Sequence, residues 1–577
     1  MAAPLDLAQR IRRVALENAL AHAGSAQPGP ILARLLATDP ELRARAAEVN
    51  LLVREALQSL APLSREAQEL ELAGLGGPEP ARRAADRTGA AELPPLPGGE
   101  MGKVVLRLAP FPSGALHLGN SRMLFINDAY RRRYQGKLFL VYDDTPGSEQ
   151  KRVDLEVFDL IRRDLEHAEI PVDATYYKSD RVPRFYPWAR RVIEADAAYV
   201  CTCPAARLRE NRAAGIACEH RAQDRDRTLE EWERMLAGAF GEGEAVLRLR
   251  TDPADPDPAF RDRVLFRVSD VDHPRVGHKY RVWPLLEFSW AVDDIELGLT
   301  HVVRGKDLVI EDKMEQFIWN LLGITGPKFL HWGLLRVREA KLSKSKSYAE
   351  VKSGAYDGWA DPRTWSLASL ERRGIRLEAV RRFTLSFGLS LSDIEVPAET
   401  LYAENRQLLD GTTMRRAFVP DPVRVHVEGY PPELQHVTLP NHPERTELGE
   451  RIVVAGPEFY LPRAELLRHA GGEIRLKDLL NVALPPEIPD RPLGAVPVTF
   501  TSRENKRLPR IQWVGAEGSA TVDVLTPEGT HTLGRGEAAL RIGEPGTTYQ
   551  FERYGFVRIE RGWVPRTEPV AVCYGHP

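Results

Sequence analysis

Hydrophobic and polar positions follow three different patterns along the 577 residues of the chain. In residues 6–72, apolar side chains recur at helical spacing, as in LAQRIRRVALENALAHA and PELRARAAEVNLLVREALQSLA, which predicts amphipathic helices. Residues 73–102 are dense in Gly and Pro and predict a flexible linker. From about residue 412, short apolar runs such as VRVHVEG and ATVDVL are broken by Pro and Gly, which predicts antiparallel β-barrels.

The segment after the linker has the pattern of a βαβ unit. KVVLRLAPF is a candidate strand that ends in a loop rich in Pro and Gly, SRMLFINDAYRRRYQGK is a candidate helix, and LFLVYDDT is a second strand. This order builds a parallel sheet and indicates an α/β domain. Because ligands bind at the carboxyl ends of the strands in an open sheet, the loop after the first strand is a candidate binding site.

Composition narrows the class of protein. Hydrophobic residues make up 43% and charged residues 28% of a chain long enough for several cores, which is ordinary for a soluble globular protein. The net charge of −3 excludes a histone-like polyelectrolyte, although a local basic face would still bind nucleic acid. No apolar stretch approaches the ~20 residues of a membrane span, and the first residues lack a signal core. We therefore expect a cytoplasmic protein with no membrane partner.

The candidate loop, RLAPFPSGALHLGN, spans residues 107–120. Its prolines, including Pro110, stiffen the backbone, and Gly114 and Gly119 permit close approach to a ligand. The N-terminus of the helix that follows favours an anion, and His117 would lie beside that anion as a donor. The alternative is a proline-rich loop with a surface histidine.

A second candidate segment, KLSKS, spans residues 341–345 and follows the apolar stretch FLHWGLLRV. Two lysines beside small hydroxyl residues make a cationic loop that could fold over a triphosphate and stabilise the charge that develops as pyrophosphate leaves. Taken alone, the segment has the pattern of a solvated charge run.

Three of the four cysteines lie within 18 residues of one another, which is not a disulfide framework. They form two close pairs of possible metal ligands, Cys201-x-Cys203 and Cys218-x-His220, separated by 14 residues. Four such ligands suit tetrahedral Zn²⁺, and the site would be structural because no position is left open for water. The spacing within each pair is tighter than in common zinc fingers, and reduced structural cysteines beside a surface histidine are the alternative.

The two loops together carry a resemblance to a known family. R-x-A-P-x-P-S-G-x-x-H-x-G resembles the ATP-binding signature of glutamyl- and glutaminyl-tRNA synthetases, and KLSKS, which begins 224 residues after His117, resembles the second class I signature. The chain is identified as a member of the archaeal-type glutamyl branch. The resemblance implies that His117, Lys341 and Lys344 are catalytic, and that ATP with Mg²⁺ is bound by Pro110, Ser113, Gly114, His117, Gly119, Asn120, Lys341, Ser343, Lys344 and Ser345. Asn120 stands where the generic signature has a second histidine.

Two further segments bear on the amino acid. LVYDDT resembles the acidic strand end of the family, with Asp143 aligned to the carboxylate that binds the substrate ammonium; a simple turn is the alternative. Residues 282–308 resemble the lining of the amino-acid pocket, where Arg304 would pair with a side-chain carboxylate and so favour glutamate over glutamine. A structural salt bridge is the alternative for Arg304. Arg107 and Ala109 complete the implied site, whereas Leu285 and Leu286 stand where the family often has a tyrosine.

The resemblance implies ATP-dependent ligation of glutamate to the 3′ end of tRNA(Glu) through a glutamyl-adenylate, with the charging of tRNA(Gln) left open.

The resemblance also implies a multidomain α/β protein with a Rossmann-like class I fold. The implied order is an N-terminal helical domain (1–72), a linker (73–102), the first half of the catalytic domain (103–200), an inserted acceptor-stem domain with the zinc knuckle (201–280), the second half with the KLSKS loop (281–361), a helical connecting domain (362–411) and β-barrel anticodon-binding domains (412–577). The N-terminal domain would bind tRNA or another protein. A glutaminyl-tRNA synthetase, and a degenerate paralogue that binds tRNA or assists assembly, are the alternatives.

Overall fold

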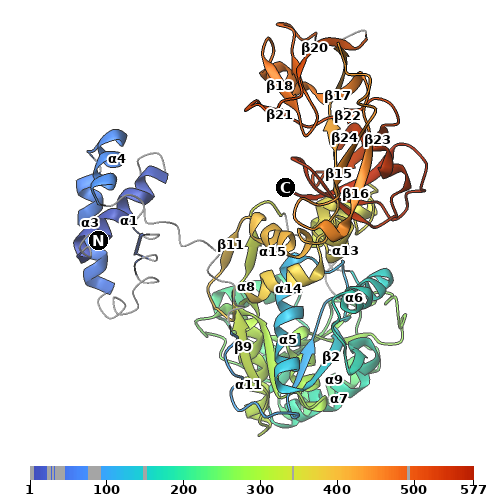
Figure 1. The fold of residues 1–577 in the computed structure, drawn as a ribbon. Helices are drawn as coiled ribbons and strands as arrows, with labels where there is room; N and C mark the ends of the chain where they lie inside the picture. Colours follow the sequence, from blue (N-terminus) through green and yellow to red (C-terminus); the bar gives the residue numbers. More distant parts are fainter. Residues whose placement is uncertain are drawn as a thin grey trace. The chain divides into compact units, whose positions relative to one another are not determined.

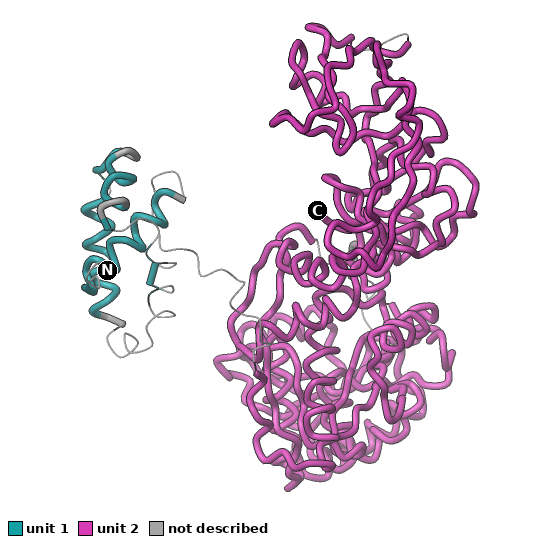
Figure 2. Tube along the Cα trace, in the orientation of Figure 1, with its two compact units in different colours: residues 1–89 teal, residues 90–577 magenta. Residues whose placement is uncertain are grey.

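The computed structural model describes residues 6–21, 28, 31–32, 35, 46–60, 62–75, 92–146, 152–340, 344–489 and 494–577. They form two compact units, residues 1–89 and 90–577 (Figure 2). The first unit contains α1 (Leu7–Ala21), α3 (Ala46–Leu60) and α4 (Arg65–Gly74). The predicted amphipathic helices are confirmed, because their apolar faces meet in a small core that includes Ile11, Ala15, Val49 and Val53.

A parallel sheet forms the centre of the second unit. Strands β1 (Val105–Leu108), β2 (Lys137–Tyr142) and β3 (Ala174–Tyr177) pair in parallel, and α5 (Ser121–Tyr134) connects the first two. The parallel pair β8 (His301–Gly305) and β9 (Lys328–Trp332) lies on the other side of β1, where the Thr300 N–H donates to the Val105 carbonyl at 3.1 Å. The predicted βαβ unit is therefore present, and the strand order reverses between β1 and β8, which is where open sheets bind their ligands.

An antiparallel sheet separates the two halves of the parallel sheet along the chain. Its four strands are β4 (Ala198–Cys201), β5 (Val246–Leu249), β6 (Val264–Val268) and β7 (Val282–Pro284), paired in that order. The helices around it are α7 (Lys178–Glu194), α8 (Ala205–Ala214), α9 (Arg225–Leu236) and α10 (Leu286–Glu296). Trp232, Phe266 and Phe288 are fully buried in its core, so this segment packs around a hydrophobic cluster of its own.

Helices surround the parallel sheet and continue beyond it (Figure 1). They are α6 (Leu155–His167), α11 (Val309–Leu321), α12 (Lys344–Lys352), α13 (Leu367–Arg372), α14 (Leu377–Leu385) and α15 (Glu399–Leu409), with the short strands β10 (Leu335–Val337) and β11 (Ile394–Val396). None of the helices in the described part of the chain is both long and apolar enough to span a membrane.

The region after residue 412 is built from two seven-stranded sheets. One has the order β12-β25-β26-β27-β23-β24-β13, with bounds Arg415–Arg416, Thr548–Phe551, Gly555–Ile559, Val570–His576, Ala520–Leu525, His531–Gly536 and Phe418–Pro420. The other has the order β21-β18-β19-β20-β14-β17-β22, with bounds Arg510–Ile511, Glu473–Leu476, Asn481–Ala483, Val496–Ser502, Pro422–Glu428, Glu458–Pro462 and Val514–Gly515. Alternate strand residues are buried, as in the pattern of β14, so each sheet has one core face.

Residues 92–102 differ from the sequence-based expectation of a flexible linker. Leu96 is buried in the core beside the parallel sheet, and its N–H donates to the Tyr134 hydroxyl at 2.8 Å. The Tyr130 hydroxyl in turn donates to the Pro94 carbonyl at 2.9 Å. The reason is that one apolar side chain and a few backbone groups suffice to anchor a Pro-rich segment on a domain surface. The expected linker begins at residue 73, but α4 continues to Gly74, and residues 76–91 lie outside the described residues.

Candidate active site

The loop between β1 and α5 is shaped by hydrogen bonds among its own residues. His117 Nδ1 accepts the Gly119 N–H at 3.0 Å, and the Asn120 side-chain oxygen accepts the His117 N–H at 3.1 Å, which starts the short 3₁₀ turn Leu118–Asn120. Because Nδ1 accepts a backbone N–H, a neutral imidazole carries its proton on Nε2 and can donate from there. Asn120 thus serves the loop as a capping residue, a role that needs no charge.

Two close approaches fix the rest of this loop. A Cβ atom on Gly114 would lie 2.8 Å from the ring of Trp359, so only glycine lets the loop pack against that indole. The Pro110 carbonyl accepts the Asp143 N–H at 3.1 Å and so ties the loop to the end of β2. Ala109 and Ser113, which directly precede Pro110 and Gly114, are half-buried.

A cleft of about 730 Å³ opens beside the loop. His117, Gly119 and Asn120 line it from the loop, Gly305 and Asp307 line it from the end of β8, and the rest of the lining includes Leu335, Arg336, Val337, Arg338 and Ala340. The cleft therefore lies at the carboxyl ends of the parallel strands, at the point of strand-order reversal, and its size suits a nucleotide.

The second predicted segment, KLSKS at residues 341–345, lies largely outside the described residues. Lys341 and Ser343 lie outside the described residues, and Lys344 and Ser345 begin α12 without described side chains. The described neighbour Ala340 lines the cleft directly before them. Their phosphate-binding roles remain predictions.

Three buried cations gather on the ring of Trp290, in α10. The Arg107 and Arg304 guanidinium carbons each lie 4.8 Å from the ring centroid, and the Lys178 Nζ lies 4.9 Å from it. All three side chains are less than a tenth exposed. Cations on an aromatic face are attracted by the ring quadrupole, and more strongly where water is excluded. Two of the three, Arg107 and Arg304, are residues that the sequence predicts for the amino-acid site.

Each of these cations has a carboxylate partner within the protein. Arg107 donates to both oxygens of Asp294 at 2.5 and 3.0 Å, and Lys178 lies 2.9 Å from the Asp143 carboxylate. Arg304 donates to Asp312 and, at 2.7 Å, to Glu315. The structural salt bridge that the sequence left open for Arg304 therefore exists, with Asp312. Its Nη1 has no hydrogen-bond partner among the described residues, so one donor remains for a further acceptor.

Burial shifts the protonation of this cluster. It raises the pKa of Glu315 to about 8 against the opposing charge of Arg304, and it lowers the pKa of the Lys178 ammonium despite the nearby Asp143. Burial therefore disfavours both the negative charge of Glu315 and the positive charge of Lys178.

The sequence did not indicate Lys178 or Glu315, and it indicated Trp290 only as part of the segment 282–308 that resembles the pocket lining. A signal was available for Lys178, because it directly follows β3 and so lies at the carboxyl edge of the same sheet. No local pattern marks Glu315, which is an ordinary interior position of a helix. Leu285 and Leu286 begin α10 and are half-buried, with Leu285 at its N-cap.

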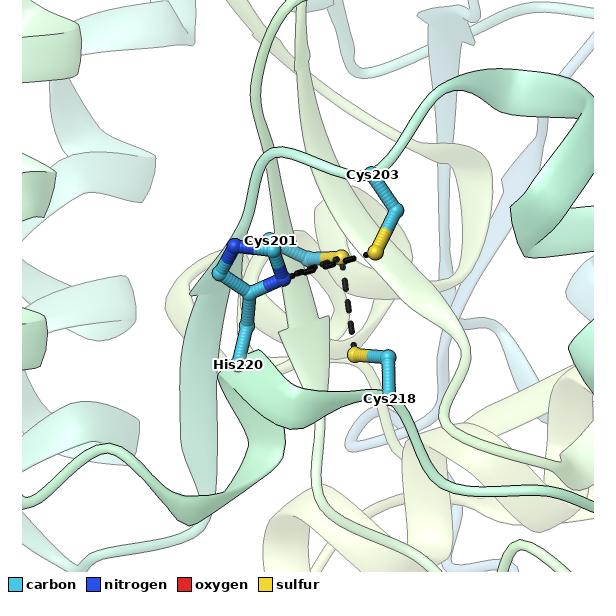
Figure 3. Close-up of side chains that lie close together, drawn as sticks. All are labelled: Cys201, Cys203, Cys218 and His220. Carbon is cyan, nitrogen blue, oxygen red and sulfur yellow. Dashed lines mark hydrogen bonds between the residues drawn. The ribbon is translucent and has the colours of Figure 1, made fainter.

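The predicted metal ligands come together at the end of β4. The ligand atoms of Cys201, Cys203, Cys218 and His220 all lie within 4.8 Å of one another (Figure 3). Cys201 Sγ is 3.7 Å from Cys218 Sγ, and Cys203 Sγ is 3.4 Å from His220 Nδ1. Sulfurs on a tetrahedral Zn²⁺, with bonds of about 2.3 Å, would lie about 3.8 Å apart, so this donor set fits the ion.

A neighbouring contact and a shifted pKa both favour metal binding by these four residues. His220 Nε2 lies 2.9 Å from the Thr202 hydroxyl, which orients the ring with Nδ1 toward the sulfurs. A hydrogen bond from Cys201 lowers the pKa of Cys218 to about 4, and a thiolate is the form that binds metal.

Comparison with known proteins assigns the fold. A family model described as "tRNA synthetases class I (E and Q), catalytic domain" matches residues 103–410. The chain belongs to this family. Two models for the anti-codon binding domain of the same family match residues 413–491 and 510–560. The resemblance predicted from the two signatures is thereby confirmed, as are the α/β catalytic fold and the sheet-rich anticodon-binding region of this synthetase.

Curated relatives of the synthetase match over nearly its whole length. A glutamate–tRNA ligase of Methanopyrus kandleri is 39% identical, covering 96% of this chain and 97% of the relative. The glutamate–tRNA ligases of Thermococcus kodakarensis and Pyrococcus furiosus are 37% and 38% identical, covering 99% and 98% of this chain and 100% and 98% of the relatives. As a member of this family, the chain is a ligase that aminoacylates tRNA.

Proposed function

We propose that this synthetase joins glutamate to the 3′ end of tRNA(Glu) through a glutamyl-adenylate intermediate. The observation that carries the proposal is the group of three cations on Trp290, at the reversal point of the parallel sheet. Glutamate carries two carboxylates and one ammonium. Arg107 and Arg304 offer two guanidinium groups for the carboxylates, and Asp143 offers a carboxylate for the ammonium. The activity of the archaeal relatives supports the same substrate.

Arg304 is the residue that selects glutamate over glutamine in this proposal. Its Nη1 donor is unpaired among the described residues and buried, so a substrate carboxylate gains a charge-assisted hydrogen bond there. A neutral amide would present one of its own donors to a cation or form a weaker bond.

The cleft beside His117 would hold ATP with its Mg²⁺. Gly119 and Asn120 line the cleft, Pro110, Ser113 and Gly114 would contact the nucleotide from the same loop, and His117 Nε2 would donate to a phosphate. The lysines of KLSKS, Lys341 and Lys344, would stabilise charge on the leaving pyrophosphate.

Two displacements complete the reaction. The α-carboxylate oxygen of glutamate attacks the α-phosphorus of ATP, and the bond to pyrophosphate breaks. The terminal ribose hydroxyl of tRNA then attacks the carbonyl carbon of the adenylate, and AMP leaves. No enzyme nucleophile takes part, so catalysis consists of positioning and charge stabilisation.

Zinc would be held by Cys201, Cys203, Cys218 and His220, where it would tie the end of β4 to the turn at residues 218–222. The antiparallel sheet that carries this site runs from β4 at residue 198 to β7 at residue 284, and we assign it, with the inserted residues 201–280, to the acceptor end of tRNA. The sheets after residue 412 are assigned to the anticodon.

The test is pyrophosphate exchange with glutamate and with glutamine, each with and without tRNA, followed by charging of tRNA(Glu) and tRNA(Gln) transcripts. We expect exchange with glutamate and charging of tRNA(Glu). Preferred exchange with glutamine would replace the substrate assignment. Charging of both transcripts with glutamate would extend the function to tRNA(Gln).

A further inference from the structure

The loop that carries His117 pairs with a distant segment of the chain. Leu118 N–H donates to the Trp365 carbonyl at 3.0 Å, and Leu367 N–H donates to the Leu116 carbonyl at 2.8 Å. These bonds form an antiparallel bridge between His117 and Ser366. The backbone position of His117 is therefore set by the segment at residues 365–367, directly before α13.

Trp365 has an unusual backbone conformation in this bridge. Its φ and ψ are 52° and 25°, the left-handed region that bulky residues rarely adopt. Such a conformation persists only where its surroundings hold it. Part of the support is local, because the Ser366 hydroxyl donates to the Trp359 carbonyl at 2.6 Å and stabilises the turn.

The remaining support comes from Arg373, at the end of α13. Its guanidinium carbon lies 5.0 Å from the centroid of the Trp365 ring, and the side chain is 1% exposed. Nη2 donates to the Tyr402 hydroxyl at 2.8 Å and to the Gly575 carbonyl at 2.7 Å, and Nε donates to the Tyr574 carbonyl at 3.3 Å.

Tyr574 and Gly575 belong to β27, in the C-terminal sheet, so Arg373 joins that sheet to the tryptophan that pairs with the His117 loop. The approach is close: a Cβ on Gly575 would lie 2.7 Å from the Arg373 carbonyl oxygen. A planar guanidinium is the side chain that can stack on a ring and still donate in its own plane to three acceptors.

We propose that Arg373 is a positioning residue for ATP binding. Arg373 acts through Trp365 and holds the His117 loop at a fixed position relative to strand β27. It touches neither substrate. The inference rests on the proposed function, because it requires ATP to bind beside His117. Its consequence is selective: loss of Arg373 displaces the loop that binds ATP, whereas the cation cluster on Trp290, held by its own ion pairs, keeps its affinity for glutamate.

The neighbouring Arg372 provides a matched control. It also links α13 to the C-terminal sheet, through Glu560 at 2.9 Å, and pairs with Asp357 at 3.2 Å. It also donates to the Ala360 carbonyl at 3.4 Å, beside Trp359, whereas the contact with the Trp365 ring belongs to Arg373. A general weakening of the interface between helix and sheet would follow from either substitution, whereas loss of loop position would follow from Arg373 alone.

The experiment measures KM for ATP, KM for glutamate and kcat of pyrophosphate exchange in the full chain for Arg373→Met, Arg373→Lys and Arg372→Met. We expect Arg373→Met to raise KM for ATP or lower kcat by roughly 10- to 100-fold, the scale for a misplaced binding group, with KM for glutamate within about twofold. Arg373→Lys should recover part of the loss. Arg372→Met should leave KM for ATP within about twofold at a comparable change in melting temperature.

Two outcomes would overturn the inference: an unchanged KM and kcat in Arg373→Met, or equal losses in the two methionine variants. If Arg373→Met does not fold, Tyr402→Phe replaces it, because it removes one acceptor of Arg373 and keeps the ring. That variant should raise KM for ATP by at least about threefold, and an unchanged value would count against the proposal. The two failures are distinguishable. Wild-type protein that is inactive with glutamate would overturn the proposed function, whereas an active wild type with unaffected variants would overturn only the role of Arg373.

Discussion

Nη2 of Arg304 lies 2.7 Å from Oε1 of Glu315, and neither side chain is more than 6% exposed. Two charged groups in this position would neutralise each other and leave little for a substrate. The raised pKa of Glu315, about 8, changes this, because a protonated carboxyl accepts the hydrogen bond without cancelling the charge of Arg304. Asp312 then provides the balancing charge on the other side of the guanidinium.

The first prediction concerns the pH dependence of glutamate binding. Below about pH 8 Glu315 is protonated, and above it the new negative charge beside Arg304 repels the substrate carboxylate. We expect KM for glutamate to rise between pH 7 and pH 9 in the wild type, and to stay level in Glu315→Gln, which keeps an acceptor but cannot ionise. KM for ATP over the same range is the control. A rise that persists in the variant would assign the titration to another group.

The second prediction tests Arg304 as the selector of glutamate. Arg304→Gln should lower kcat/KM for glutamate by several kcal/mol, of the order of a lost charge-assisted pair with a poorly solvated carboxylate, and should change glutamine little. The variant also leaves Asp312 without its partner, so the melting temperature should fall for that reason alone. The ratio of the two kcat/KM values separates the effects. An unchanged ratio would make Arg304 a structural ion-pair residue and reopen the choice of substrate.

The third prediction tests the KLSKS segment. Lys344→Ala should slow adenylate formation by at least ~100-fold, the scale for a lost transition-state charge contact, with glutamate affinity nearly unchanged. Lys346→Ala, two residues farther along in the same charge run, is the matched control and should lose far less. Rapid-quench measurement of single-turnover activation provides both values. Similar rates in the two variants would mean that the run acts only as a diffuse positive charge.

The fourth prediction concerns zinc. Purified protein should contain one equivalent of zinc per chain by elemental analysis, and Cys218→Ala should reduce this content and lower the melting temperature. Cys573→Ala removes the buried cysteine of β27, which lies in a different part of the fold, and should retain the metal. Metal-free wild-type protein that is folded and active would contradict a structural zinc site.

The sequence was informative where function resides in a contiguous string. The βαβ unit and the loop around His117 were predictable, because strand, turn and helix signals and the glycine positions are all local. The Trp290 cluster was only half predictable: its members come from β1, the end of β2, the start of α7, α10, β8 and α11, which only the fold brings together. Lysine is usually a surface residue, so its type predicts exposure for Lys178. It is buried because Asp143 and the Ser289 hydroxyl both bind its ammonium. Leu96 shows the same limit, since one apolar residue in a Pro-rich segment gives no periodicity from which packing could be predicted.

The strand order of the C-terminal sheets bears on how this region can be divided and how it folds. Both edge strands of one sheet, β12 and β13, come from residues 415–420, whereas its interior strands come from residues 520–576, and the other sheet occupies the chain between them. A fragment cut between the two matched anticodon segments would leave both edge strands without partners. This sheet closes only when residues more than 110 positions apart in the chain pair, such as Phe418 with Gly536 and Arg415 with Gln550, which slows its formation relative to a sheet of successive hairpins. We therefore expect the two sheets to fold as one module.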